Sequence, residues 1–138
     1  MDYSTSLVRQ EDVVRKRIDQ TVPDTLVFVE HPDVITCGRG ADKNNIKSDG
    51  MPVVDISRGG DVTYHGPGQQ VVYPIVQLSE QSQNLHLVLR VLEDWIINAV
   101  AKFEISAGRK ENLTGVWVGE KKIASIGIAV KRWVTYHG

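Results

Sequence analysis

The sequence has 138 residues, of which 41% are hydrophobic and 24% are charged, and its formal net charge at pH 7 is −1. This size and composition predict one soluble domain spanning residues 1–138. The near-neutral charge gives no global basic field for nucleic acid, and no apolar run reaches the ~18 residues of a membrane span. The first residues lack the apolar core of a secretory signal, and one cysteine cannot form an internal disulfide. We therefore expect a cytoplasmic protein, or one of an organelle matrix in a eukaryote.

The first half of the chain alternates between helical and extended patterns. Apolar spacing predicts a helix over residues 4–20, with Ser4 as its N-cap. Its apolar stripe comprises Tyr3, Leu7, Val14 and Ile18. Runs rich in β-branched and aromatic residues predict strands at 25–30, 34–37 and 53–56. Residues 38–52 are polar, contain glycine and show no period, which predicts a long loop that covers a site.

A polar linker over 79–83 leads into the clearest helix, which is expected over 84–103 with Asn84 as its N-cap. Apolar residues recur along this segment at three- and four-residue spacing. The pattern predicts a helix that belongs to the hydrophobic core.

The last third of the chain has the pattern of a hairpin. Extended runs at 113–118 and 121–130 flank Gly119-Glu120, and glycine at the first central position suits a two-residue turn. A final strand is expected over 132–137.

The most informative stretch is 58–73, which reads RGGDVTYHGPGQQVVY. Polar and apolar residues alternate before Gly66-Pro67-Gly68 and again after it, which predicts two strands joined as a hairpin. Gly59-Gly60 removes two side chains, so that a ligand can approach the bare backbone and its N–H groups. The stretch is therefore predicted to be a binding site.

Three single residues invite a chemical hypothesis, and each has a structural alternative. His65 could contact a ligand or transfer a proton, or serve only in packing. Cys37 could be a nucleophile, although its place at the end of an apolar strand favours packing. Lys122 shares its strand face with Ala124 and Ile126, so its charge would be costly to bury; the alternative is a stem that reaches water. No spacing of ligand residues predicts a metal site.

Taken together, several motifs resemble the signature of the lipoyl(octanoyl) transferases, in the order in which that family has them. The motifs are Glu30-His31-Pro32, Arg58-Gly59-Gly60, Thr63-Tyr64-His65-Gly66-Pro67-Gly68-Gln69, Gly119-Glu120-Lys121-Lys122-Ile123, Ser125-Ile126-Gly127 and His137-Gly138. The resemblance implies an α+β fold, with a mixed, largely antiparallel sheet flanked by helices, like the catalytic domain of biotin- and lipoate-protein ligases.

The resemblance also implies a function. The family moves an octanoyl or lipoyl group from acyl carrier protein to a lysine of the lipoyl domains of 2-oxoacid dehydrogenase-type complexes, through a thioester on an enzyme cysteine. No cofactor, nucleic acid or membrane is implied. By resemblance the substrate-binding residues would be Arg58, Gly59, Gly60, Asp61, Val62, Thr63, Tyr64, His65, Ser125, Ile126, Gly127, His137 and Gly138. Lys122 matches the family lysine that lowers the pKa of the nucleophilic cysteine.

The family cysteine lies in an Asn-Pro-Cys-like segment downstream of the His-Gly pair, where this sequence ends. We therefore expect the 138-residue chain to lack the nucleophile and to be inactive in acyl transfer alone. Two alternatives remain open at this point. One is an ATP-dependent lipoate-protein ligase, which needs no enzyme cysteine, and the other is a non-catalytic module that binds acyl groups.

Overall fold

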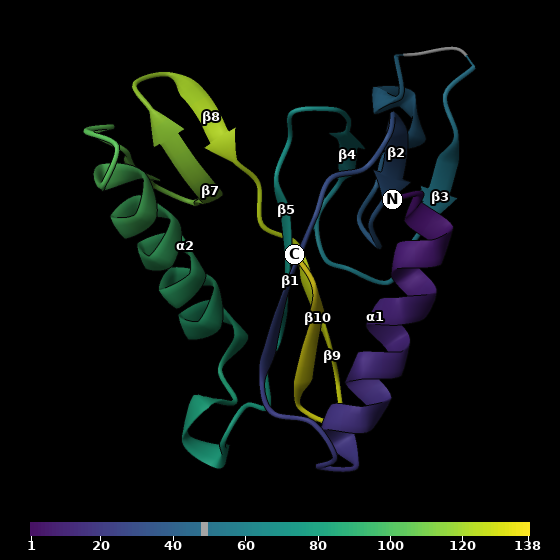
Figure 1. Ribbon diagram of the computed structural model, residues 1–138. Helices are drawn as coiled ribbons and strands as arrows, with labels where there is room; N and C mark the ends of the chain where they lie inside the picture. Colours follow the sequence, from purple (N-terminus) through teal and green to yellow (C-terminus); the bar gives the residue numbers. More distant parts are fainter. Residues whose placement is uncertain (48–49) are drawn as a thin grey trace. The chain divides into compact units, whose positions relative to one another are not determined.

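The computed structural model describes residues 1–47 and 50–138, which form two compact units. Unit 1 comprises Met1–Leu78 and Gly127–Gly138, and unit 2 comprises Ser79–Ile126. Figure 1 shows the helices and strands of both units. Within the described ranges, no helix is both long and apolar enough to cross a membrane.

Unit 1 begins with helix α1, Tyr3–Ile18, which packs against strands β5 and β10. The helix is confirmed, but its predicted cap is wrong: the side chain of Asp2 accepts a hydrogen bond from the backbone N–H of Thr5 at 2.8 Å. The predicted stripe is only partly right. The buried residues of α1 are Tyr3, Ser6, Gln10 and Val14. Two of the four are polar, because this face of the helix supplies hydrogen bonds to unit 1 as well as apolar contacts.

Among the described residues of unit 1, seven strands form three small sheets, and all pairings but one are antiparallel. Strands β1 (Thr25–Val29) and β5 (Val71–Ile75) form the first sheet. The second has β2 (Val34–Cys37) between β3 (Val53–Asp55), which is parallel to it, and β4 (Val62–His65). The third is the hairpin of β9 (Ile128–Lys131) and β10 (Val134–His137). The predicted mixed, largely antiparallel α+β architecture is therefore confirmed.

The core of unit 1 lies between α1, β5 and β10. Val14, Ile75 and Val134 are at most 3% exposed and pack together, one from each of these elements. The backbone N–H of Thr135 donates to the carbonyl of Val76 at 2.9 Å, so β10 is joined to the residue that follows β5. Burial of these apolar side chains is the main stabilising contribution in a domain of this kind.

The predicted hairpin within 58–73 is wrong. Strand β4 pairs with β2, whereas β5 pairs with β1, so the two runs around Gly66-Pro67-Gly68 lie in different sheets. The turn itself is present, since the N–H of Gln69 donates to the carbonyl of Gly66 at 3.1 Å. Alternation and turn residues locate the two strands but do not determine which strand each one pairs with. Here β4 pairs with β2, whose four residues are all buried.

The predicted loop over 38–52 contains the short helix η1, Lys43–Asn45, and its residues 48–49 lie outside the described ranges. Asp61 binds this loop to the glycine-rich stretch. Its carboxylate accepts bonds from the backbone N–H of Asp42 at 2.9 Å and from the side-chain amide of Asn45 at 2.6 Å. One carboxylate therefore fixes the start of the loop beside β4.

Unit 2 contains η2 (Glu80–Ser82), α2 (Leu85–Ala101), β6 (Gly108–Lys110), β7 (Leu113–Val118) and β8 (Lys121–Ala124). The predicted cap of α2 is confirmed, because the Asn84 side chain accepts from the N–H groups of His86 and Leu87. The β7–β8 hairpin is also confirmed: Val118 pairs with Lys121, and Gly119 has a φ of 54°. Strand β6 was not predicted.

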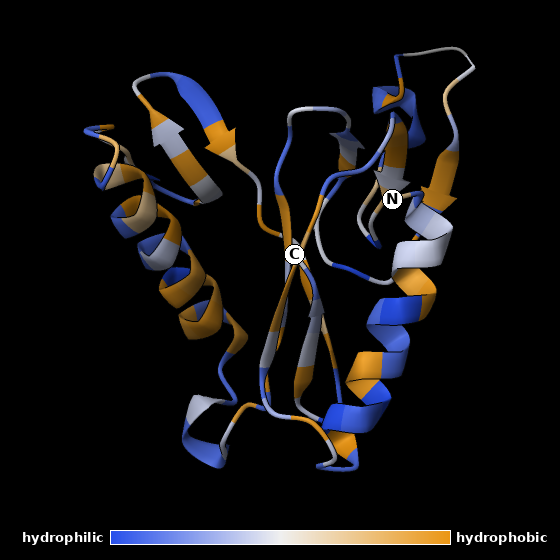
Figure 2. Ribbon diagram, in the orientation of Figure 1, coloured by the Kyte–Doolittle hydropathy of each residue, from blue (hydrophilic) through white to orange (hydrophobic). Residues whose placement is uncertain are grey.

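Two expectations for unit 2 are wrong. The run 121–130 is not one strand, because β8 ends at Ala124 and the next strand, β9, begins at Ile128 in unit 1. Helix α2 is not a core helix, since its one buried residue is Glu93, while Trp95 is 49% exposed. Figure 2 shows apolar residues along the length of α2. Periodicity predicts an apolar side for a helix, but not how completely that side is covered.

Candidate functional site

The centre of the candidate site in unit 1 is the buried guanidinium of Arg58, whose residue is 6% exposed. One of its nitrogens, Nη2, donates to both the carbonyl and the hydroxyl oxygen of Thr36, each at 2.9 Å. Nη1 donates to the carbonyl of Gly59 at 2.9 Å. Burial lowers the pKa of Arg58, chiefly by removing its charge from water. Within the part of the chain that the structure describes, this cation is therefore hydrogen-bonded to neutral oxygen atoms.

Glycine residues let the backbone close around this guanidinium. A Cβ atom added at Gly38 would lie 2.8 Å from Arg58 Nη1 and 2.4 Å from the carbonyl oxygen of Gly60. One added at Gly127 would lie 2.9 Å from the carbonyl oxygen of Gly59. Side chains cannot be accommodated at such distances without a shift of the backbone, so these positions require glycine. Gly127 and the Gly59-Gly60 pair, predicted separately from two motifs, are thus brought together.

His137 and Gly138 reach the same part of unit 1. His137 is 2% exposed, and its backbone N–H donates to the side-chain oxygen of Gln10 in α1. Its Nε2 lies 3.2 Å from the hydroxyl of Ser57. Burial, together with the charge of Arg58, lowers the pKa of His137 to about 4. The carbonyl of Gly138 accepts from the N–H of Gly127 at 2.6 Å.

His65 lies at the end of β4 with both ring nitrogens in hydrogen-bond contact. Nδ1 is 2.8 Å from the side-chain oxygen of Gln69, and Nε2 is 3.2 Å from the hydroxyl of Thr36. Burial is the main reason that the pKa of His65 is lowered, and the charge of Arg58 adds to it, so the ring is neutral at pH 7. Thr36 therefore lies between the predicted residues Arg58 and His65.

A second histidine, His31, packs beside the first, with ring centroids 6.0 Å apart. His31 is 1% exposed, and its Nε2 lies 2.7 Å from the hydroxyl of Tyr73. Tyr3 packs against both imidazoles, and burial raises its pKa to about 12. His31 therefore has a structural role, because its contacts with Tyr3 and Tyr73 join α1 to β5 through buried polar groups.

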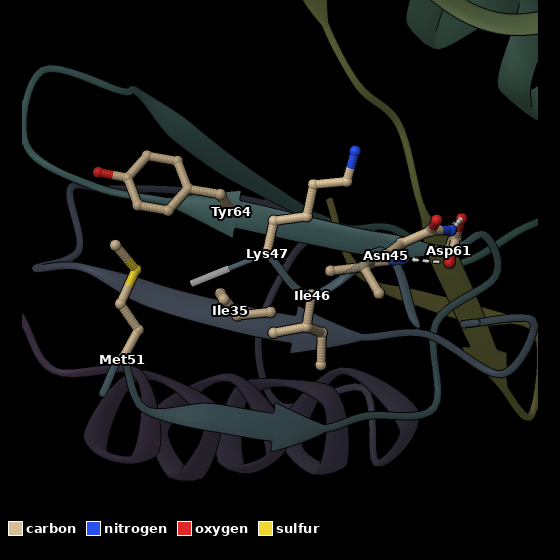
Figure 3. Close-up of a pocket in the computed structure, with 8 residues that line it drawn as sticks. Ile35, Asn45, Ile46, Lys47, Met51, Asp61 and Tyr64 are labelled. Atoms are coloured by element: carbon tan, nitrogen blue, oxygen red, sulfur yellow. Dashed lines mark hydrogen bonds between the residues drawn. The ribbon is translucent and has the colours of Figure 1, made fainter. Parts of the chain in front are cut away.

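The predicted stretch 58–65 presents residues on both faces of its sheet. Thr63 and His65 lie on the face of Thr36, since Thr36 pairs directly with Thr63. Tyr64 and Val62 face the other way and line an open cavity of about 410 Å³ (Figure 3). Its other lining residues are Ile35, Asn45, Ile46, Lys47, Met51 and Asp61. The stretch therefore borders two surfaces, and Arg58 lies with Thr36 and His65 on one of them.

Three other predicted site residues belong to unit 2: Lys122, Ser125 and Ile126. The apolar setting expected for Lys122 is wrong, because the residue is exposed and its strand ends two residues later. Its ammonium lies 5.0 Å from the ring centroid of Trp117, at a distance typical of a cation–π contact. Gly115 leaves room for the lysine stem, since a Cβ there would lie 2.5 Å from Lys122 Cε.

Cys37, the only cysteine, is 2% exposed and lies in β2, as the packing interpretation expects. Among residues 1–47 and 50–138, no cluster of His, Cys, Asp and Glu is arranged to hold a metal ion.

Sequence reasoning missed Thr36, Gln10 and Ser57, which contact the predicted residues. None has a local signal, because each reaches the site through pairing or packing of segments distant in sequence. Gln69 did have one, since it belongs to the motif that contains His65.

This arrangement of helices and small sheets matches a class of protein with solved structures. A bipartite lipoate protein ligase from Thermoplasma acidophilum superposes with a TM-score of 0.67 at 19% identity, over 94% of this chain and 54% of that one. Lipoate-protein ligase A bound with ATP gives a TM-score of 0.68 at 17% identity, over 89% of this chain and 57% of that one. At these identities the matches show the fold, which is that of lipoate-protein ligases.

The sequence comparisons define the family. Residues 2–138 match the model of the lipoyl protein ligase A/B catalytic domain, and the chain belongs to that family. It is 44% identical over 138 residues to an octanoyltransferase of Geobacter metallireducens and 46% identical over 145 residues to one of Syntrophobacter fumaroxidans. These matches cover the whole of this chain, whereas they cover 65% and 64% of the length of the two relatives. A chloroplastic octanoyltransferase of Arabidopsis thaliana is 46% identical over 125 residues, which is 87% of this chain and 45% of that protein.

Proposed function

We propose that this chain is the acyl-binding part of an octanoyltransferase, which moves an octanoyl or lipoyl group from acyl carrier protein to a lysine of a lipoyl domain. The observation that carries the proposal is the identity of 44% to 46% with octanoyltransferases over the full length of this chain. The reaction would take place in the cytoplasm, or in an organelle matrix in a eukaryote.

The geometry of unit 1 suits recognition of an acyl thioester. The guanidinium of Arg58 is a fixed donor group in a site from which water is largely excluded, and such donors stabilise charge that develops on a carbonyl oxygen. The bare backbone of Gly59-Gly60 and Gly127 lies close to this group, so backbone N–H groups can contribute to the same site. We assign substrate binding to the stretch 58–65 and to residues 125–127, 137 and 138.

The proposed chemistry is two acyl transfers through a thioester. A cysteine thiolate attacks the donor thioester and releases the donor thiol, and the acceptor lysine amine then attacks the enzyme thioester. We do not assign the thiolate to Cys37, because that residue is 2% exposed within a strand. The resemblance instead implies a cysteine in a segment after the His-Gly pair. Lys122, which is exposed, would favour the thiolate form of that cysteine through its positive charge.

Mass spectrometry of the intact protein tests this proposal. Residues 1–138 incubated with octanoyl acyl carrier protein should show no stable acyl adduct, and a Cys37→Ser control should behave identically.

A protein that continues into the coding sequence after Gly138 should gain an acyl adduct and pass it to a lipoyl domain. If that longer protein neither keeps an adduct nor modifies the domain, octanoyl transfer is the wrong function. Exchange of labelled pyrophosphate into ATP in the presence of octanoate would instead identify a ligase, because a ligase activates the acid as an adenylate.

A further inference from the structure

A chain of hydrogen bonds in unit 1 runs from Arg58 through Thr36 and His65 to Gln69. Arg58 Nη2 lies 2.9 Å from Thr36 Oγ1, which lies 3.2 Å from His65 Nε2. His65 Nδ1 lies 2.8 Å from Gln69 Oε1, and Gln69 Nε2 lies 3.3 Å from the carbonyl oxygen of Tyr64. Each group in this chain therefore has a polar neighbour on both sides.

The two ends of the chain fix the direction of the bonds made by Arg58 and Gln69. A guanidinium can only donate, so Arg58 donates to the hydroxyl oxygen of Thr36. At the other end, the carbonyl of Tyr64 can only accept, so the amide nitrogen of Gln69 faces it and the amide oxygen faces His65. An amide oxygen is an acceptor, and His65 Nδ1 must therefore carry the hydrogen.

A neutral imidazole with its hydrogen on Nδ1 has a lone pair on Nε2, which needs a donor. The hydroxyl of Thr36 is the donor within reach, at 3.2 Å. Its alternative acceptor, the carbonyl of Thr63, is farther away at 3.4 Å, and that choice would leave Nε2 without a donor. The groups around the ring, Arg58, His31 and Tyr3, include no carboxylate that would favour an imidazolium.

We propose that Thr36 and Gln69 are positioning residues, which hold His65 as the Nδ1–H tautomer and join it to Arg58. Both ring nitrogens are then engaged, so His65 forms a fixed polar wall of the acyl site and does not accept a proton from substrate. The mechanistic part of this inference rests on the proposed octanoyl transfer, whereas the tautomer is a property of the chain itself.

Long-range ¹H–¹⁵N NMR of the imidazole rings at pH 7 tests the proposal, with His65 assigned from the signals lost in His65→Gln. The chain should show a protonated Nδ1 and a bare Nε2. Gln69→Leu removes the acceptor at Nδ1 and should shift the tautomer ratio towards Nε2–H by roughly fivefold, the effect of one ordinary hydrogen bond. Gln70→Leu, at the neighbouring position outside the chain of bonds, should leave the ratio unchanged.

Thr36→Val should move the Nε2 signal, and Thr36→Ser, which restores the hydroxyl, should return it. Since Gln69 is exposed, its variants test the proposal even if Thr36→Val does not fold. A bare Nδ1 in the unaltered chain, or a tautomer ratio unaffected by Gln69→Leu, would overturn the proposal. The measurement needs no acyl substrate, so its failure leaves octanoyl transfer standing, and failure of the mass-spectrometric test leaves the tautomer standing.

Discussion

Replacing Glu93 by glutamine should weaken unit 2, because this carboxylate joins α2 to β7. Glu93 is 1% exposed, and its oxygens accept from the N–H of Gly115 at 3.0 Å, from Arg109 Nε at 2.7 Å and from Arg90 Nη1 at 2.8 Å. A glutamine keeps the shape but loses the charge, and its NH₂ group must face one of these donors.

The expected loss is about 2 kcal/mol of unfolding free energy. A hydrogen bond to a charged group contributes about 1.5–3 kcal/mol. The side chains of Arg90 and Arg109 are 50% and 32% exposed, so they regain water after the change and their contributions are discounted. A loss is expected in either orientation of the amide, because either the buried N–H of Gly115 loses its acceptor or the NH₂ group faces both arginines.

The pH dependence has a defined sign. Burial alone would raise the pKa of Glu93, but the hydrogen bonds from Gly115, Arg109 and Arg90 outweigh it, and the pKa is lowered from 4.5. Stability from this group is therefore fully present above pH 4.5 and is lost as the pH falls through the lower folded-state value.

Urea unfolding followed by circular dichroism, with amide exchange of Gly115, measures the effect at pH 7 and at pH 3.5. Glu111→Gln, at an exposed position, is the matched control. Equal stabilities of the original and Glu93→Gln proteins at pH 7, or a difference that does not shrink at pH 3.5, would refute the reasoning.

Three further predictions concern unit 1 and can be tested by urea unfolding. Gly38→Ala should lower the free energy of unfolding by about 1–3 kcal/mol, because the new Cβ would lie 2.4 Å from the carbonyl oxygen of Gly60. In Gly40→Ala the new Cβ would lie 3.5 Å from the same oxygen, so this control should be nearly neutral. The pKa of His137 is lowered from 6.5 to about 4, so the free energy of unfolding should fall by up to roughly 3 kcal/mol as the pH drops between these two values. His137→Asn should reduce this fall. Arg132 and Trp133 have φ values of 48° and 60°, so replacing the pair by Asn-Gly should stabilise the β9–β10 turn by about 1 kcal/mol. An unchanged or lower midpoint of urea unfolding would contradict this prediction.

Local chemistry in the sequence determined the elements of the chain. Asn84 caps α2 with its own side chain, and Gly119 provides the positive φ of a two-residue turn, so neither requires a distant partner. The motifs also predicted Arg58, Gly127 and His137 as site residues, and the structure places all three in unit 1.

Tertiary structure alone decided which elements pair and what surrounds each side chain. Strands β4 and β5 follow one another yet join different sheets, because pairing depends on which buried strand lies beside each of them. The face of α1 that carries Ser6 and Gln10 is buried, and Lys122 is exposed, since burial depends on the segments that pack around a residue. For the same reason, Thr36 could not be assigned to the site from its neighbours in sequence: the pairing of β2 with β4 brings its hydroxyl between Arg58 and His65.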